Sequence, residues 1–223
     1  MKGISIILFL FFNGLALAQN QPAKTIDYKT YKASLKKDPK QKLLAIKKII
    51  PGIELDIKYA TTDNFSGIAV YPKAKAFARK EVVMALAKIQ SELNNDGLGL
   101  KIFDAYRPYA VTVQFWEITP PDLREFVSDP KKGSRHNRGC AIDLTLVNLN
   151  SGEELNMPTR YDSFTKEAYA DAENISPLQK KNREELIDIM QRNGFKVLKN
   201  EWWHFDFVGW ENYPLMDIPF KKL

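Results

Sequence analysis

The sequence lacks the features that mark several common protein classes. It has one cysteine, Cys140, so no disulfide bond can form within the chain. No repeat, low-complexity stretch or glycine- and serine-rich linker divides it, which favours a single domain with one core. Basic and acidic residues number 33 and 27 and are mostly scattered, so no nucleic-acid partner is predicted. After the first 18 residues no apolar run approaches the roughly 20 residues of a membrane span, so stable membrane insertion is not predicted either.

Residues 1–18 are predicted to be a secretory signal peptide. Lys2 precedes an apolar run over 4–15, and Ala16-Leu17-Ala18 has the small-residue pattern of a cleavage site. We expect cleavage near Ala18 and export to the periplasm or out of the cell. The residue directly after the cleavage site is Gln19 and not a cysteine, so no lipid anchor is predicted. Because Lys2 is the only charged residue removed, the net charge would fall from +6 to +5, which suits an anionic cell envelope.

Two further regions are predicted after the signal peptide. Residues 19–50 read as a leader followed by a short helix, because Pro39 interrupts this lysine-rich segment, and residues 51–223 form the main domain. In that domain Ile53–Tyr59 alternates like a strand, and Phe77–Leu93 has apolar residues at helical spacing.

The helix that follows Ser176 has the strongest end signals. Ser176 is a predicted N-cap, Pro177 takes the first helical position, and Gln179 completes a capping box. Asn193-Gly194 is expected to end the helix, and strands over 195–198 and 203–207 are expected to pair behind it. Strands and helices do not alternate regularly. The predicted fold class is therefore α+β, with a mainly antiparallel sheet and flanking helices.

Only two histidines are present, His136 and His204, and each lies close to a carboxylate in the sequence. Gly139 permits a turn between a loop that carries His136 and a strand that contains Asp143, and His204 would approach from the C-terminal strand. Two imidazoles and a carboxylate, with a fourth position open, are a ligand set of catalytic zinc. The sequence thus predicts one zinc ion per chain, held by His136, Asp143 and His204.

Two more residues suggest hydrolysis. Glu201, freed by the turn at Asn200, is placed to take a proton from a metal-activated water and to return it to a leaving amine. Arg107, held by Pro108 after a predicted strand, is placed to hold a carbonyl oxygen as charge builds on it. The alternative for each residue has no catalytic role: Glu201 would lie in an exposed turn, and Arg107 in a surface turn. Cys140 shares a strand face with Ile142, opposite Asp143, which favours core packing over metal ligation.

Four segments carry a resemblance to a known family: Tyr59–Gly67, Asp104–Pro108, Ser134–Thr145 and Glu201–Phe205. They resemble the zinc-dependent D-alanyl-D-alanine dipeptidases of the vancomycin-resistance type, which share a hedgehog-like zinc fold with D,D-carboxypeptidases. The resemblance implies that His136, Asp143 and His204 bind zinc, that Glu201 is the general base and acid, and that Arg107 stabilises the tetrahedral intermediate. Residues 51–223 would then be the catalytic domain.

The same resemblance implies two substrate contacts. Ser134 matches a residue that meets the substrate carboxylate, and Asp162, in a methionine-led loop from Met157, matches one that meets the substrate ammonium. This loop has Pro158 and Tyr161 where close relatives carry other residues. A substrate with both charged ends recognised must be a small D,D-dipeptide.

Two alternatives stay open at this point. A D,D-carboxypeptidase acting on peptidoglycan stem peptides would share the zinc and Glu201 but would need an open cleft. A catalytically silent, zinc-containing binding module of the envelope would need neither Glu201 nor Arg107, whose presence argues against it. The sequence leaves the oligomeric state open.

Overall fold

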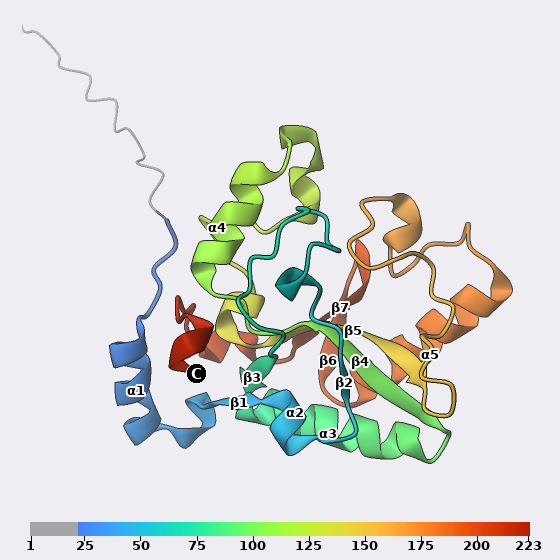
Figure 1. Cartoon of the computed structure of the whole chain (residues 1–223), viewed down its shortest axis with the longest axis horizontal. Helices are drawn as coiled ribbons and strands as arrows, with labels where there is room; N and C mark the ends of the chain where they lie inside the picture. Colours follow the sequence, from blue (N-terminus) through green and yellow to red (C-terminus); the bar gives the residue numbers. More distant parts are fainter. Residues whose placement is uncertain (1–21) are drawn as a thin grey trace, which may run out of the picture.

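A mixed sheet forms the centre of the computed structural model, which describes residues 22–223; the predicted signal peptide lies outside the described residues. Of the strand pairs in this sheet, β2 with β4 is parallel and the other three are antiparallel. The predicted α+β class with a mainly antiparallel sheet is confirmed. In order across the sheet the strands are β2 (Glu54–Leu55), β4 (Leu98–Asp104), β5 (Ala141–Asn148), β7 (Glu201–Phe207) and β6 (Phe195–Leu198), while β1 (Leu43–Ala45) and β3 (Phe77–Arg79) pair separately (Figure 1).

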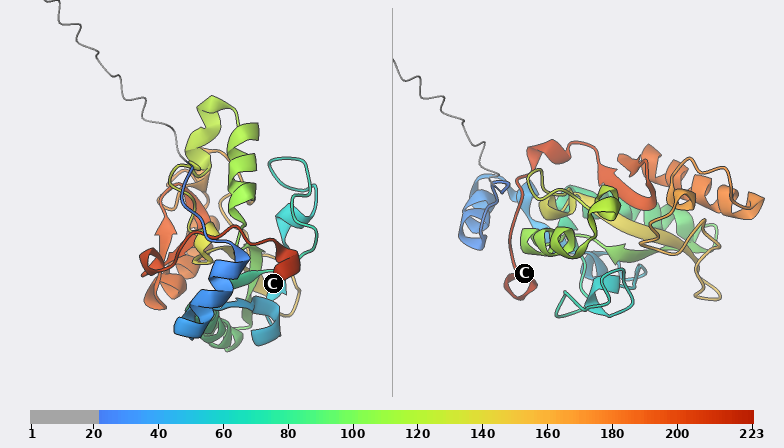
Figure 2. Two further views of the ribbon diagram at one scale, coloured as in Figure 1. Left: turned by 90° about the vertical axis from the view of Figure 1, so that its left-hand side faces the viewer. Right: turned by 90° about the horizontal axis from the view of Figure 1, so that it is seen from above.

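Helices cover the sheet unequally. The long helices α3 and α5 pack on one face through apolar side chains such as Leu86 and Ile189, and α4 lies on the other side (Figure 2). Short 3₁₀ turns lie between the helices and strands along the chain. The helices are α1 (Tyr28–Lys37), α2 (Ile46–Ile49), α3 (Lys80–Asn94), α4 (Tyr109–Ile118) and α5 (Pro177–Arg192), and the turns are η1 (Pro39–Gln41), η2 (Lys58–Ala60), η3 (Pro121–Phe126), η4 (His136–Arg138), η5 (Lys166–Ala168), η6 (Trp210–Asn212) and η7 (Phe220–Lys222).

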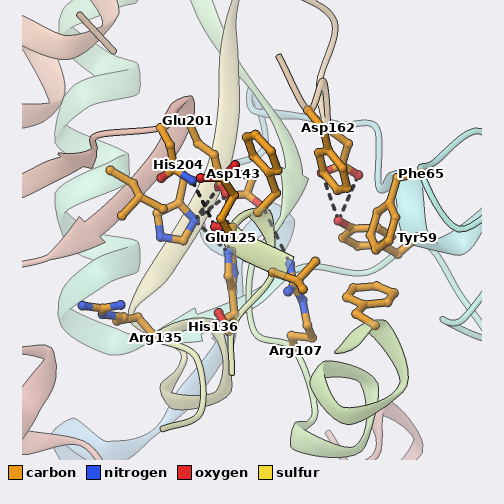
Figure 3. A pocket seen from close by; sticks show the side chains of 17 residues that line it. Tyr59, Phe65, Arg107, Glu125, Arg135, His136, Asp143, Asp162, Glu201 and His204 are labelled. Carbon is orange, nitrogen blue, oxygen red and sulfur yellow. Dashed lines mark hydrogen bonds and ion pairs between the residues drawn. The ribbon is translucent and has the colours of Figure 1, made fainter. Parts of the chain in front are cut away.

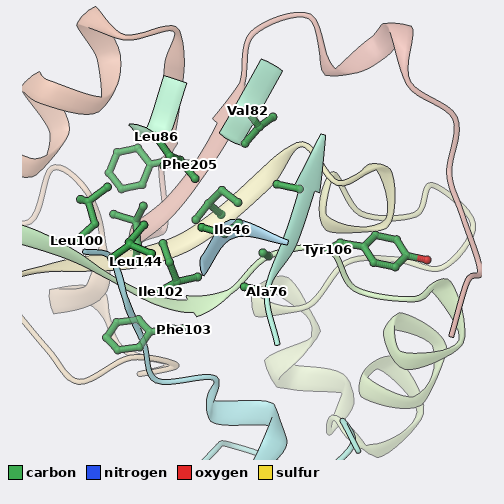
Figure 4. Packing of buried hydrophobic residues seen from close by; sticks show 14 of the residues in the cluster. Ile46, Ala76, Val82, Leu86, Leu100, Ile102, Phe103, Tyr106, Leu144 and Phe205 are labelled. Carbon is green, nitrogen blue, oxygen red and sulfur yellow. The ribbon is translucent and has the colours of Figure 1, made fainter. Parts of the chain in front are cut away.

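The main core lies between the sheet and the long helices. Ile142 and Leu144 of β5 and Phe205 of β7 enter it together with the apolar face of α3 (Figure 4). Ile46, fully buried, belongs to the same core, so residues on both sides of position 50 pack together. Asp143 lies between Ile142 and Leu144 in an extended strand and therefore faces the opposite side of the sheet. That opposite side carries the polar site.

The predicted ends of α5 are confirmed. The backbone N–H of Gln179 donates to Ser176 Oγ at 3.2 Å, and the backbone N–H of Ser176 donates to Gln179 Oε1 at 2.9 Å. At the other end Gly194 adopts a φ of 89°, in the left-handed region that favours glycine. The Gln179 amide also donates to the carbonyl oxygen of Met157 at 3.1 Å, so the start of this helix fixes the loop before it.

Two local predictions were wrong. The strand expected over Ile53–Tyr59 is limited to Glu54–Leu55, after which the chain turns into η2. Alternation reports burial, and Ile57 and Tyr59 are indeed buried, but their turn is not paired with a neighbouring strand. The helix expected from Phe77 begins only at Lys80, because Phe77–Arg79 pairs with β1. Among the described residues, no helix combines the length and apolar character needed to cross a membrane.

Candidate metal centre and active site

Strand register places two predicted ligands side by side. Asp143 of β5 pairs directly with His204 of β7, and Asp104 of β4 pairs with Asp143 on the other side. An irregularity between Ile102 and Asp104 shifts the β4 register, which brings Asp104 opposite Asp143. The sheet thus carries a row of Asp104, Asp143 and His204 on the face away from the main core.

The third ligand enters from the turn before β5. His136 starts η4, and Gly139 ends that turn in a left-handed conformation with a φ of 71°. The chain then enters β5 at Ala141. This is the loop-to-strand junction that the sequence predicted, and it brings the His136 ring against that of His204, with ring centroids 4.8 Å apart.

The three predicted ligand atoms form a compact triangle. His136 Nε2 lies 3.1 Å from His204 Nδ1 and 3.3 Å from Asp143 Oδ1, and the last two atoms are 2.9 Å apart. A tetrahedral ion with ligands at about 2.0–2.1 Å would hold them about 3.3 Å apart. All three residues are buried. The donor set and its spacing therefore fit a zinc-type ion.

The atoms on the far side of these ligands are also engaged. His136 Nδ1 lies 2.7 Å from the carbonyl oxygen of Ala105, and His204 Nε2 lies 3.0 Å from Asp206 Oδ1. With those nitrogens as donors, Nε2 of His136 and Nδ1 of His204, 3.1 Å apart, keep lone pairs that can bind a metal ion. Outer hydrogen bonds of this kind fix the orientation of metal-binding histidines.

The charged groups around the three ligand atoms also favour the binding of a cation. Burial opposes a charge on Asp143, yet the two neighbouring histidines hold its pKa well below the usual range. Burial disfavours a protonated His204, but Asp206 and Asp143 raise its pKa above the ordinary value. The surrounding carboxylates thus stabilise positive charge at this point, which a divalent ion would supply.

Glu201 lies beside the triangle. One carboxylate oxygen, Oε2, is 3.7 Å from His204 Nδ1, and burial raises the pKa of Glu201 to about 7. The sequence placed this residue in a turn, whereas the structure makes it the first residue of β7. The β6–β7 register shifts between Val197 and Leu198, which lets Glu201 and His204 share a face despite their spacing of three.

Arg107 is held rigidly at the wall of the same site. Its Nε and Nη2 donate to Asp104 Oδ2 at 3.0 and 2.8 Å, and its guanidinium lies over the rings of Tyr59 and Phe115. Nη2 is 3.9 Å from Asp143 Oδ2. Its remaining nitrogen, Nη1, makes no hydrogen bond with the residues that the structure describes, so it is available to a ligand.

Of the two predicted substrate residues, Asp162 lines the pocket and Ser134 does not. Asp162 accepts from the Tyr59 hydroxyl at 2.9 and 3.1 Å, and it has a left-handed φ of 58°, which is uncommon for a residue other than glycine. Burial, together with the nearby charge of Asp143, raises its pKa well above the usual range. Ser134 is buried behind His136, whose backbone N–H donates to its hydroxyl at 3.2 Å, and it does not line the pocket.

A pocket of about 220 Å³ joins these groups (Figure 3). Drug-sized ligands occupy pockets of about 300–1,000 Å³, so this one suits a smaller molecule. Its walls combine aromatic rings with charged groups of both signs. Its lining includes Tyr59, Phe65, Arg107, Phe115, Glu125, Phe126, Arg135, His136, Asp143, Asp162, Phe164, Glu201 and His204.

Comparison with known proteins identifies the family. The family model described as D-Ala-D-Ala dipeptidase, of the M15 peptidases, matches residues 39–217. The chain belongs to this family. It is 37% identical to the D-alanyl-D-alanine dipeptidase of Escherichia coli K12 over 173 residues, which cover 78% of this chain and 88% of that protein. It is 34% identical to the enzyme of the same name from Enterococcus faecium over 193 residues, with coverage of 78% and 95%. Among solved structures, the LdcB LD-carboxypeptidase gives a TM-score of 0.38 at 20% identity, over 61% of each chain.

Three residues of this family member's site were missed from the sequence. Asp104 anchors Arg107, and Asp206 holds His204. The Tyr161 hydroxyl donates to Asp143 Oδ2 at 2.9 Å, on the carboxylate oxygen that is not part of the triangle. Asp206 could have been found from the sequence. It lies two residues after His204 on a predicted strand, so the two side chains were expected on the same face. The roles of Asp104 and Tyr161 depend on register and loop path, which spacing does not reveal.

Cys140 is fully buried, and burial raises the pKa of its thiol to about 12. Its sulfur lies 3.6 Å from the carbonyl oxygen of Arg138, and it is not part of the ligand triangle. The structure therefore agrees with core packing for this residue.

Proposed function

We propose that this protein is a zinc-dependent dipeptidase that hydrolyses D-Ala-D-Ala to two molecules of D-alanine. One observation carries the proposal: the ligand atoms of His136, Asp143 and His204 form a buried triangle beside Glu201, in a pocket of about 220 Å³. The names of the relatives and of the matching family support the substrate class.

The triangle would hold one zinc ion per chain, since the described residues contain one such group. When bound, zinc supplies a Lewis acid that lowers the pKa of water to about 7 and polarises a carbonyl. The protein holds the ligands in one orientation through Ala105 and Asp206. It also keeps the ligand atoms away from bulk solvent, because all three residues are buried.

Glu201 would move the protons of the reaction. Its carboxylate accepts a proton from the attacking water and then donates it to the amine of the departing D-alanine. A carboxyl group with a pKa of about 7 suits both steps, because it exchanges protons readily near neutral pH. Arg107, fixed by Asp104, would donate from Nη1 to the carbonyl oxygen as negative charge develops there.

Charged groups at the pocket wall would select a short zwitterionic substrate. An ammonium group beside Asp162 would offset the burial that now raises the pKa of this carboxyl. Arg135 lines the same pocket; its guanidinium now lies 3.5 Å from Asp206 Oδ2 and over the Trp210 ring, and it would turn from them to meet the substrate carboxylate. A longer stem peptide has an amide where the dipeptide has its ammonium, and would leave Asp162 without a charge partner.

The deciding experiment measures D-alanine release from D-Ala-D-Ala, L-Ala-L-Ala and a pentapeptide that ends in D-Ala-D-Ala. Each assay is run on the untreated protein, after chelation, and after zinc is added back. We expect cleavage of the D,D-dipeptide alone, lost on chelation and restored by zinc. Cleavage of the pentapeptide would instead indicate a D,D-carboxypeptidase. Absence of all cleavage in zinc-loaded protein would indicate a binding module.

We also propose that residues 1–18 direct export and are removed near Ala18. The support is the basic, apolar and small-residue pattern of the sequence itself. N-terminal sequencing of protein recovered outside the cytoplasm should begin at Gln19. Recovery of the intact N-terminus from the cytoplasm alone would contradict export.

A further inference from the structure

Positive charge is concentrated in one short part of the chain. Residues 22–50 contain nine lysines, no arginine and two aspartates, whereas residues 51–223 contain 23 basic and 25 acidic residues. Helix α1 also precedes the family match, which starts at position 39. The net positive charge of the described chain therefore comes from a segment that is largely separate from the catalytic machinery.

Most of these lysines form no ion pair with an acid among the described residues. Among the ion pairs of the described residues, the segment contributes Lys40 with Glu81 at 3.2 Å. Lys47 donates to the carbonyl oxygen of Ile53, which leaves its charge uncompensated. The side chains at Lys42 and Lys48 are exposed. A lysine-rich segment alone is usually a solvated surface, so a second feature is needed to indicate a ligand.

That feature is an apolar groove of about 480 Å³ beneath the lysines. Its floor is formed by β1, the start of β3 and Leu55, and Ile49 of α2 stands at its edge with 44% of its surface exposed. No acidic side chain lines it among the residues described. Four lysines do: Lys42, Lys47, Lys48 and Lys75.

The groove is separate from the active site. The two sets of lining residues have no member in common among the described residues. In Figure 1 the groove elements α2 and β1 lie toward the bottom, beside α1, while α4 of the active-site wall rises at the top. Tyr31 of α1 holds this region together, because its hydroxyl accepts from the backbone N–H of Leu43 at 2.7 Å. A surface bound at the groove would leave the catalytic pocket open.

We propose that this lysine-rimmed groove docks the protein on anionic phospholipid bilayers. An apolar floor with ammonium groups at its rim complements an amphiphile, whose anionic headgroup meets the lysines while its chain contacts the floor. A nucleic acid or other hydrophilic polyanion would use the lysines but not the apolar floor. The contact is peripheral, and it concentrates a dipeptidase at a membrane surface.

The test is sedimentation of the full chain with vesicles of phosphatidylcholine, with and without phosphatidylglycerol, at low and high salt. We expect binding to the anionic vesicles that weakens with salt. Each lysine near an anionic bilayer contributes a factor of about five in affinity, so Lys42→Gln, Lys48→Gln and Lys75→Gln together should weaken binding about a hundredfold. Ile49→Ser should weaken it by roughly tenfold through loss of apolar contact.

The matched control replaces Lys166, Lys181 and Lys196, which are exposed and lie outside the groove, with glutamine. This triple variant has the same net charge and should keep most of the binding. Equal losses in both triple variants, or equal binding to neutral and anionic vesicles, would overturn the proposal. So would binding to heparin without binding to vesicles. Dipeptide hydrolysis by the groove variants should be unchanged, which shows that they are folded.

Discussion

Each candidate metal ligand is held from the side that faces away from the ion position. For His136 the holder is a backbone carbonyl, and for His204 it is Asp206. For Asp143 it is Tyr161, a residue of the loop from Met157 that also contains Asp162. The hydroxyl of Tyr161 therefore links the geometry of the metal carboxylate to the position of the loop.

Replacing Tyr161 with phenylalanine should weaken zinc binding by on the order of tenfold, because outer hydrogen bonds to metal ligands typically contribute 10–100-fold in affinity. Competition with a chromophoric chelator measures this directly, without reliance on catalysis. The matched control is Tyr213→Phe, which removes a similar tyrosine–carboxylate bond of 2.7 Å to Glu81, a residue outside the ligand triangle. Equal zinc affinity in the wild type and Tyr161→Phe would show that the Tyr161 hydroxyl does not support zinc binding.

Replacing Glu201 with glutamine should leave zinc bound and reduce kcat by at least about 10²–10⁴-fold, the usual contribution of a general base. The amide keeps the size of the side chain but cannot accept the proton of the attacking water. Zinc content by elemental analysis and turnover of D-Ala-D-Ala are measured on the same sample. Substantial turnover with zinc bound would remove Glu201 from the mechanism.

Much of the residue-level chemistry was predictable because the chain has so few histidines. With only His136 and His204 available, a zinc site with two histidine ligands had to use both of them. Their outer partners were not predictable in the same way. Tyr161 reaches Asp143 across 18 positions through a loop, and no local pattern encodes such a contact.

At the scale of elements, the junction between η4 and β5 controls the site. Gly139 ends η4 with a φ of 71° beside β1, and a Cβ added there would lie 2.6 Å from Leu43 Cδ2. A side chain must therefore bear both an unfavourable backbone conformation and a steric clash. This junction sets the direction in which His136 approaches Asp143.

Gly139→Ala should lower the free energy of unfolding by about 2–4 kcal/mol, from the left-handed backbone and the overpacking together. Gly152→Ala is the control, because its φ is 74° but no atom lies within 4 Å of the added Cβ. That change should cost only about 1–2 kcal/mol. Urea denaturation of both variants gives the comparison, and equal losses would show that the clash with Leu43 is relieved at no cost.

Local sequence signals predicted some elements well and others poorly, for identifiable reasons. The capping box of Ser176 and Gln179 involves neighbours in sequence, so the start of α5 could be predicted from the local sequence. The shared face of Glu201 and His204 depends on a register shift against β6, which only strand pairing determines. The strand expected near Ile57 failed for the same reason, since alternation indicates burial and not a pairing partner.

At the scale of the whole molecule, the ion is expected to contribute to folding stability. The described chain places Asp143, Asp162 and Glu201 close to one another, and burial penalises each carboxylate. A bound cation offsets part of this cost in the folded state and is absent from the unfolded one.

Chelation should therefore lower Tm, and zinc at 100 times its Kd should restore about 2.7 kcal/mol of stability. Differential scanning fluorimetry with and without chelator measures the shift. A His136→Ala variant should show little response to chelator or zinc, because one corner of the triangle is removed. An equal response in that variant would indicate that zinc stabilises the fold elsewhere.

The fold class could be predicted from the sequence more readily than the groove on the surface. The α+β class could be inferred from irregular element order, and the concentration of lysines near the N-terminus is visible in the printed chain. The groove beneath those lysines could not be inferred. It depends on β1, β3 and Leu55 meeting across a long separation in sequence.

The single thiol has a practical consequence for measuring motion in this protein. Cys140 is fully buried with its pKa raised to about 12, so maleimide reagents will not modify it in the folded state. A cysteine introduced on the loop near Ser163, paired with another on α4, can carry a donor and acceptor dye in an otherwise native background. Single-molecule energy transfer can then follow how the loop approaches the pocket, without first mutating the core.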